Sequence, residues 1–231
     1  MKKILNLWEK HSHTSYAQSG EDRIISFIFD WIQVKSPTYL DIGAHHSSWL
    51  SNTYLFYKNG SSGVCIEPDP YLFSEIKRTR KRDTCLNIGI SSAAQEMADF
   101  YVMTSRSLNT FSKEDALRCQ ETRNFGEQKI EKIIQVPLYT VNDIMAKYCS
   151  NGVNLISVDV EGLDFEIVKS FDFQKYQPEI FCIETLRYDE NGILQKNNEL
   201  IKFMKEKEYS IYGETYINTI FVSKEVRQLL K

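Results

Sequence analysis

Short apolar runs, each about as long as a β-strand, alternate with longer amphipathic stretches along most of this chain. Such alternation is typical of β-α-β units, in which parallel strands form a sheet and helices cover its faces. The sequence predicts strands at 38–43, 63–67, 84–88, 153–159 and 179–184. It predicts helices at 19–34, 51–59, 70–81, 140–148 and 197–208, and a final antiparallel hairpin of 209–213 with 219–223. We therefore expect an α/β fold.

The chain length of 231 residues, 42% of them hydrophobic, suits one domain with a single sizeable core. We expect this domain to span 16–231 and to follow a flexible leader at 1–15. The polar stretch 105–135 is rich in charge and has no strong apolar period. Long segments of this kind are usually functional or disordered, so we expect an insertion or a lid there.

The charges exclude some classes of partner. The formal net charge is -3 and the basic residues are dispersed, so we expect no nucleic acid partner and favour a small-molecule or glycan acceptor. No apolar run is long enough for a transmembrane segment, and the start is too polar for a signal peptide, which predicts a cytoplasmic protein. The five cysteines are widely spaced and are expected to be buried thiols. The oligomeric state is left open.

The end of the first predicted strand has the features of a ligand-binding loop. Asp41 is followed closely by Gly43, at the strand edge where an open parallel sheet binds its ligand. The residues after Gly43 lack the further glycines of a dinucleotide fingerprint, which disfavours a pyrophosphate and hence a nicotinamide-dependent oxidoreductase. S-adenosylmethionine carries no phosphate and needs no such fingerprint.

The ends of the next two strands complete this expected cofactor site. Glu67 ends the second strand, where its carboxylate can accept hydrogen bonds from both hydroxyls of a ribose. Asn87 and Ile88 end the third strand, and we expect them to border an adenine. The alternative for Glu67 is a surface carboxylate at a strand end.

Seven motifs in order resemble those of the FkbM family of S-adenosylmethionine-dependent methyltransferases. They are YAQSGED at 16–22, LDIGAHH at 40–46, SNTYLFY at 51–57, VCIEPDP at 64–70, VPLYTVND at 136–143, ISVDVEG at 156–162 and PEIFCIE at 178–184. Three positions depart from the family pattern: Asn142, Ser157 and Gln177 stand where the family has Asp, Lys and Arg. We expect the cofactor site to survive these changes.

The resemblance implies a class I (Rossmann-like) methyltransferase with a mostly parallel seven-stranded sheet flanked by helices. It also implies S-adenosylmethionine as cofactor and, because members mostly methylate hydroxyl groups, an O-methylation. The cofactor-binding residues that it implies are Gly20, Glu21, Asp22, Asp41, Gly43, Ala44, Asn52, Glu67, Pro68, Asn87, Ile88 and Asp159. For Gly20, Glu21 and Asp22 the alternative is a helix N-terminus with capping acids.

A hydroxyl acceptor needs a base or a metal ion, because a protonated hydroxyl is a poor nucleophile. His11 and His13 lie in the leader, so a histidine base would be His45 or His46. His46 corresponds to the histidine of the family motif, and we expect it to take the proton. The alternative is that one of the pair packs and the other caps the helix after Ser51.

Acidic side chains gather at the ends of the fourth and fifth strands. We expect Asp159, Glu161 and Glu184 to bind the acceptor's hydroxyls, with Mg²⁺ or Mn²⁺ as an optional ion between them. Glu161 alternatively caps the following helix. The predicted activity is therefore O-methylation of a sugar, a nucleotide-linked sugar or a surface glycan, as in polysaccharide biosynthesis. N-methylation, natural-product tailoring and a non-enzymatic cofactor-binding module are the alternatives.

Overall fold

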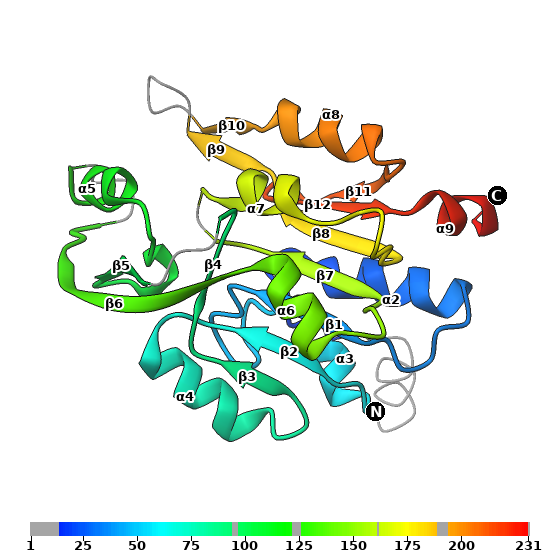
Figure 1. Ribbon diagram of the computed structural model, residues 1–231, viewed down its shortest axis with the longest axis horizontal. Coiled ribbons are helices and arrows are strands. Elements are labelled where there is room, and N and C mark those ends of the chain that lie inside the picture. Colours follow the sequence, from blue (N-terminus) through cyan, green and yellow to red (C-terminus); the bar gives the residue numbers. More distant parts are fainter. Residues whose placement is uncertain (1–13, 94–96, 122–125, 161, 189–193, 231) are drawn as a thin grey trace, which may run out of the picture.

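A computed structural model describes residues 14–93, 97–121, 126–160, 162–188 and 194–230. Its centre is a seven-stranded sheet in the order β11-β12-β8-β7-β1-β2-β3 (Figure 1). The strands are β1 Tyr39–Ile42, β2 Gly63–Ile66, β3 Thr84–Leu86, β7 Leu155–Val158, β8 Ile180–Glu184, β11 Ser210–Glu214 and β12 Asn218–Val222. Strands β3, β2, β1, β7 and β8 run parallel, and β12 pairs antiparallel with both β8 and β11. The predicted fold class and C-terminal hairpin are confirmed.

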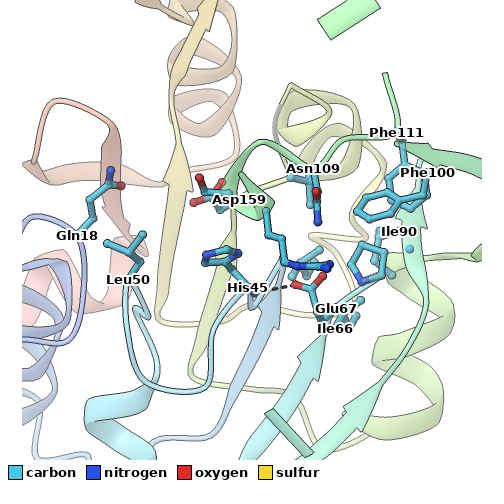
Figure 2. A pocket seen from close by; sticks show the side chains of 17 residues that line it. Gln18, His45, Leu50, Ile66, Glu67, Ile90, Phe100, Asn109, Phe111 and Asp159 are labelled. Carbon is cyan, nitrogen blue, oxygen red and sulfur yellow. Dashed lines mark hydrogen bonds between the residues drawn. The ribbon is translucent and has the colours of Figure 1, made fainter. Parts of the chain in front are cut away.

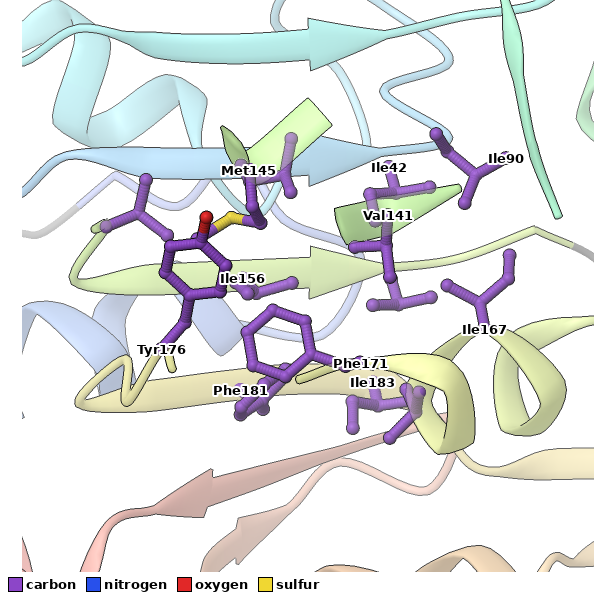
Figure 3. Close-up of a cluster of buried hydrophobic side chains, with 14 of the residues drawn as sticks. Ile42, Ile90, Val141, Met145, Ile156, Ile167, Phe171, Tyr176, Phe181 and Ile183 are labelled. Carbon is purple, nitrogen blue, oxygen red and sulfur yellow. The ribbon is translucent and has the colours of Figure 1, made fainter. Parts of the chain in front are cut away.

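Helices cover both faces of this sheet and bury two apolar clusters. On one face lie α6 Val141–Tyr148, α7 Asp164–Ser170 and α8 Asn198–Glu206. On the other lie α2 Glu21–Trp31, α3 Tyr54–Lys58, α4 Pro70–Thr79 and α9 Lys224–Leu229. Figure 3 shows part of the first cluster, in which Ile42 of β1 and Ile156 of β7 meet Met145 of α6. Burial on both faces explains why the central strands read as continuous apolar runs.

A second sheet, in the order β4-β6-β5, lies beside the main one (Figure 1). Its strands are β4 Gly89–Ser91, β5 Met97–Met103 and β6 Ile130–Thr140; between β5 and β6 come the 3₁₀ helix η1 Arg106–Leu108 and helix α5 Lys113–Glu121. The stretch 105–135 was predicted without regular structure, yet it holds η1, α5 and the start of β6. The periodic signal is weak because α5 buries only Ala116 and β6 leaves Ile133 half exposed.

Several elements differ from the sequence-based expectation. The helix predicted from Ser51 begins at Tyr54, and the third strand ends at Leu86. Helices α7 and α9 and the small hairpin of β9 Leu186–Tyr188 with β10 Leu194–Lys196 were not predicted, because they are too short for a clear period. Residues 1–13 of the predicted leader, with His11 and His13, lie outside the described residues. Within the described part of the chain, no helix combines the length and apolar character needed to span a bilayer.

Candidate active site

A cavity lies where β1, β2 and β7 end, between the main sheet and the smaller one. The cavity has a volume of about 140 Å³ and opens to solvent on one side. The main sheet contributes Ile42, Gly43, His45, Leu50, Ile66, Glu67, Pro68, Asp159 and Val160, and the segment before α2 contributes Gln18. The other lining residues are Gly89, Ile90, Phe100, Arg106, Ser107, Asn109 and Phe111. Figure 2 shows the labelled side chains around the cavity.

Gly43 is required by a close approach of two loops. Its φ is +81°, and a Cβ built on it would lie 1.8 Å from the backbone carbonyl oxygen of Asp159. Its N–H donates to the carbonyl of Ile66 at 3.1 Å, and the neighbouring Ala44 N–H donates to the same oxygen. Ala44 itself is buried in the core rather than in the cavity lining. The loop therefore runs tightly between the ends of β2 and β7, and Gly43 permits a close approach to the Asp159 backbone; its approach to a ligand stays a prediction.

Glu67 is a buried carboxylate held by backbone donors. One oxygen accepts the N–H of His45 and the other the N–H of Asp69, both at 2.8 Å (Figure 2 draws the first). Burial raises the pKa of Glu67 to about 8, and the two backbone hydrogen bonds oppose this shift. The side chain is therefore fixed in the cavity wall, at the position predicted from the end of the second strand.

Asn87 and Ile88 do not line the cavity. The Asn87 side chain donates to the backbone carbonyls of Glu67 and Pro68, at 2.8 and 2.9 Å, and Ile88 packs against the core. The expectation assumed that the third strand continues to Ile88, but the chain leaves the main sheet after Leu86. Ile90, two residues after Ile88, lines the cavity instead.

Asp41 and Asn52 support the loop from behind the cavity. Asp41 accepts a hydrogen bond from Thr53 and lies 3.7 Å from the fully buried guanidinium of Arg80. Asn52 donates to the Ser157 hydroxyl at 3.1 Å. Burial raises the pKa of Asp41, and the Arg80 charge opposes this. Neither side chain lines the cavity, so their predicted role in cofactor binding is at most an indirect one through the loop 43–53.

Gly20, Glu21 and Asp22 begin α2 and anchor the segment before it. Gly20 is the N-cap residue with φ +93°. Glu21 accepts from the Ser19 N–H at 2.8 Å and from Asn218 at 3.0 Å, and Asp22 accepts from the Tyr16 N–H at 2.7 Å. Of this region only Gln18 lines the cavity. Both acids lie in the first turn of α2, but no side chain of the described residues caps the helix, because their oxygens accept hydrogen bonds from the segment before it and from Asn218.

Asp159 is the acid of the predicted cluster that lines the cavity. Burial raises its pKa to about 6, the nearby charge of Asp41 adds to this, and a hydrogen bond with Glu184 opposes it. Glu161 lies outside the described residues. Asp164 accepts the N–H groups of Val160 and Gly162 at 3.1 and 3.2 Å. It therefore binds the turn before α7, which Glu161 was alternatively expected to cap. Among the described residues, no group of three potential metal ligands occurs.

The two histidines of the loop have different surroundings. His45 lines the cavity, its φ is +51°, and burial lowers its pKa. His46 is not in the lining. Its Nδ1 accepts the N–H groups of Ser48 and Trp49, at 3.2 and 3.0 Å, so the ring caps the turn that follows.

The cavity wall from the smaller sheet was not predicted. Phe100 and Phe111 form an apolar side, with ring centroids 4.7 Å apart. Arg106 pairs with Asp69, which also accepts from Asn109 at 3.0 Å. No local motif marks these residues, because they reach the cavity only through the pairing of β4 and β5 with β6.

Solved structures with a similar arrangement include S-adenosylmethionine-dependent methyltransferases. A TehB-like enzyme from Corynebacterium glutamicum is 12% identical, with a TM-score of 0.45, over 96% of this chain and 95% of that one. An O-methyltransferase from Bacillus cereus is 11% identical, with a TM-score of 0.41, over 96% and 90%. The 1,6-didemethyltoxoflavin-N1-methyltransferase of Burkholderia thailandensis is 8% identical, with a TM-score of 0.43, over 96% and 83%. No curated protein sequence is significantly similar to this chain.

The sequence itself provides the assignment. The family model of the methyltransferase FkbM domain matches residues 41–211, about three quarters of the chain. The match covers the loop at Gly43, the carboxylate of Glu67 and the end of β7 at Asp159, which meet at the cavity. The chain therefore belongs to the FkbM methyltransferases and is an S-adenosylmethionine-dependent enzyme.

Proposed function

We propose that this enzyme methylates a hydroxyl group of a sugar, a nucleotide-linked sugar or a surface glycan. The observation that carries the proposal is that His45 and Asp159, two side chains able to accept a proton, line the same cavity as Glu67 and Gly43. A methyl transfer to oxygen needs such a group, because the acceptor proton must leave as the new bond forms. Polysaccharide biosynthesis is the setting that this chemistry suits.

The residues of the cavity fit the cofactor of the family. The tight loop at Gly43 forms part of the cavity wall, and Glu67 offers fixed acceptor oxygens to ribose hydroxyls. Ile90, Phe100 and Phe111 offer an apolar surface to the adenine. When bound, S-adenosylmethionine supplies a methyl group on a positive sulfonium, so the protein's task is alignment and the exclusion of water.

His45 is the proposed proton acceptor, in place of the expected His46. Its burial favours the neutral imidazole, which can accept a proton near pH 7. His46 uses Nδ1 to cap the turn and does not line the cavity. Asp159 is proposed to bind an acceptor hydroxyl, with Glu184 as its hydrogen-bonded partner. A second version of this proposal adds a Mg²⁺ or Mn²⁺ ion bound by Asp159, Glu161 and Glu184.

Transfer of a labelled methyl group from S-adenosylmethionine to a panel of acceptors tests the function. We expect labelled methyl ethers on free sugars, nucleotide-linked sugars or glycan fragments, and none on their amino analogues at nitrogen. Labelling of amines alone would instead support the N-methyltransferase alternative. A chelator shows whether the acids act through a metal ion. If turnover is lost with the chelator and restored by Mg²⁺ or Mn²⁺, the acids bind a metal. If the rate does not change, we infer that the carboxylates contact the acceptor directly.

Glu67→Gln is expected to weaken S-adenosylmethionine binding at least tenfold in calorimetry. The change keeps the shape but removes charge-assisted hydrogen bonds, each worth roughly 1.5–3 kcal/mol. Because Glu67 binds as the carboxylate and its pKa is about 8, wild-type affinity should rise as the pH increases towards 8 and then level off. In Glu67→Gln that rise should be lost. Glu75→Gln, at the outer surface of α4, is the control, and equal affinities of all three proteins would contradict the ribose role.

The segment from Ser105 to Gln135 is proposed to cover the bound acceptor. Its Phe111 lies on the side proposed for the adenine, and Arg106 and Asn109, both bound to Asp69, form the adjoining wall, so the cover would extend from the cofactor towards the acceptor. We expect hydrogen exchange of the η1 backbone to slow when cofactor product and acceptor are both present. Arg106→Ala should weaken this protection without unfolding α5. The same fast exchange in free and bound enzyme would reduce the segment to a surface loop.

A further inference from the structure

Trp49 is an exposed side chain on a constrained loop. Its relative exposure is 61%, although indole is among the side chains that gain most from burial. A single exposed apolar residue is ordinary on a protein surface, so exposure alone assigns no role. The conformation of the loop around Trp49 supplies the further observations.

The turn that carries Trp49 is held at both ends. His45 and Leu50 have φ values of +51° and +54°, in the left-handed region that residues with a Cβ rarely adopt. The N–H of Trp49 is bound by the His46 ring, and the N–H of Ser51 donates to the Tyr16 carbonyl at 2.9 Å. Backbone strain of this kind persists where the surroundings enforce it, and it clusters at ligand sites. The turn directs Leu50 into the cavity and leaves the indole outside.

The indole lies next to a residue of the cavity wall. Its ring centroid lies 6.3 Å from that of His45, which lines the cavity, and 6.2 Å from that of His46, which meets it edge to face. In Figure 2, His45, Leu50 and Gln18 lie on the side away from Phe100 and Phe111. If the adenine occupies the phenylalanine side, Trp49 stands beside the side that is left for the acceptor.

We propose that Trp49 is a stacking platform for the sugar ring of the acceptor, an inference that rests on the proposed function. A pyranose ring presents a face of C–H groups with weak positive charge, which suits the negative face of an indole. Its hydroxyls point outward from the ring edge, where His45, Gln18 and Asp159 offer hydrogen-bonding groups. Stacking of the ring on the indole, together with hydrogen bonds to the hydroxyls at the ring edge, would determine which hydroxyl lies next to the methyl group.

Kinetics of Trp49→Ala and Trp49→Phe with the best sugar acceptor test the platform. We expect Trp49→Ala to raise the acceptor KM by roughly tenfold, consistent with the size of aromatic contacts, while the Kd of S-adenosylmethionine stays within twofold. Trp49→Phe should recover most of this loss, because it keeps a flat aromatic face. Trp31→Ala is the control, since Trp31 is also exposed, at 55%, but lies on α2, where its indole N–H donates to the Leu229 carbonyl instead of lying beside His45.

The outcomes separate this inference from the function on which it rests. An unchanged acceptor KM in Trp49→Ala, or an equal loss in Trp31→Ala, overturns the platform while wild-type turnover of sugars still supports O-methylation. A fall in cofactor affinity equal to the rise in KM also overturns it, because Trp49 would then act on the loop and not on the acceptor. If the wild type methylates amines and no sugar, the proposed function fails and the platform fails with it.

Discussion

Gly43→Ala is expected to weaken S-adenosylmethionine binding and to lower kcat by about a hundredfold or more, since misplacement of a site by about 1 Å can reduce the rate by that order. The added Cβ would lie 1.8 Å from the Asp159 carbonyl oxygen, so the ends of β1 and β7 must separate. Backbone atoms cannot rotate away as a flexible side chain can. The separation displaces the cavity wall at the point where Asp159 and the loop meet.

Gly152→Ala is the control that isolates this clash. Gly152 has nearly the same φ, +79° against +81°, but a Cβ there would meet no atom within 4 Å. Both variants therefore carry the left-handed strain of about 1–2 kcal/mol, and only Gly43→Ala adds the close contact. Calorimetric titration with the cofactor and thermal unfolding of both proteins make the comparison. Cofactor binding by Gly43→Ala within threefold of Gly152→Ala would exclude Gly43 from the site.

The parts of the site that the sequence predicts are those set by strand ends. In a parallel sheet the carboxyl ends of neighbouring strands meet at one edge, so residues far apart in sequence can be placed together from the strand pattern alone. Gly43, Glu67, Pro68 and Asp159 line the cavity for this reason. The pairings of β1 with β2 and with β7 bring these residues together.

The parts that the sequence does not predict depend on contacts outside the main sheet. Gly89 pairs with Leu138, and a Cβ on Gly89 would lie 2.3 Å from the Phe111 ring. This close contact places the smaller sheet against the cavity, and no local pattern reports it. The pairing also draws the chain away after Leu86, so that Ile90 lines the cavity and Ile88 does not.

Some of the predicted acids bind other parts of the protein and do not line the cavity, whereas Glu67 and Asp159 do. A carboxylate in a motif looks the same in sequence whether it binds a ligand or a backbone N–H. The carboxylate oxygens of Glu21 and Asp22 accept backbone N–H groups of the segment before α2. Asp41 accepts a hydrogen bond from Thr53 and lies beside Arg80. The partner, which decides the role of each acid, becomes visible only in the fold.

His45→Asn is expected to lower kcat by about 10²–10⁴-fold, the usual contribution of a positioned base, while the Kd of the cofactor stays within twofold. Asparagine is chosen because it tolerates the left-handed backbone that His45 adopts at φ +51°. His46→Asn is the matched control: its side-chain oxygen can replace Nδ1 as the acceptor for the Ser48 and Trp49 N–H groups. If His46→Asn loses turnover and His45→Asn does not, the base is His46, as the family motif suggests.

The pH dependence of kcat separates His45 from the acid beside it. A base must be deprotonated, so kcat should fall as the pH drops through the base's pKa, which for His45 lies below the ordinary 6.5 because the ring is buried. Asp159, whose pKa burial raises to about 6, also titrates below neutral pH. In His45→Asn the residual rate should therefore lose this acid limb if His45 is the base. If the fall in kcat at low pH persists in His45→Asn and disappears in Asp159→Asn, Asp159 is the base. Only a group that still titrates can produce this fall.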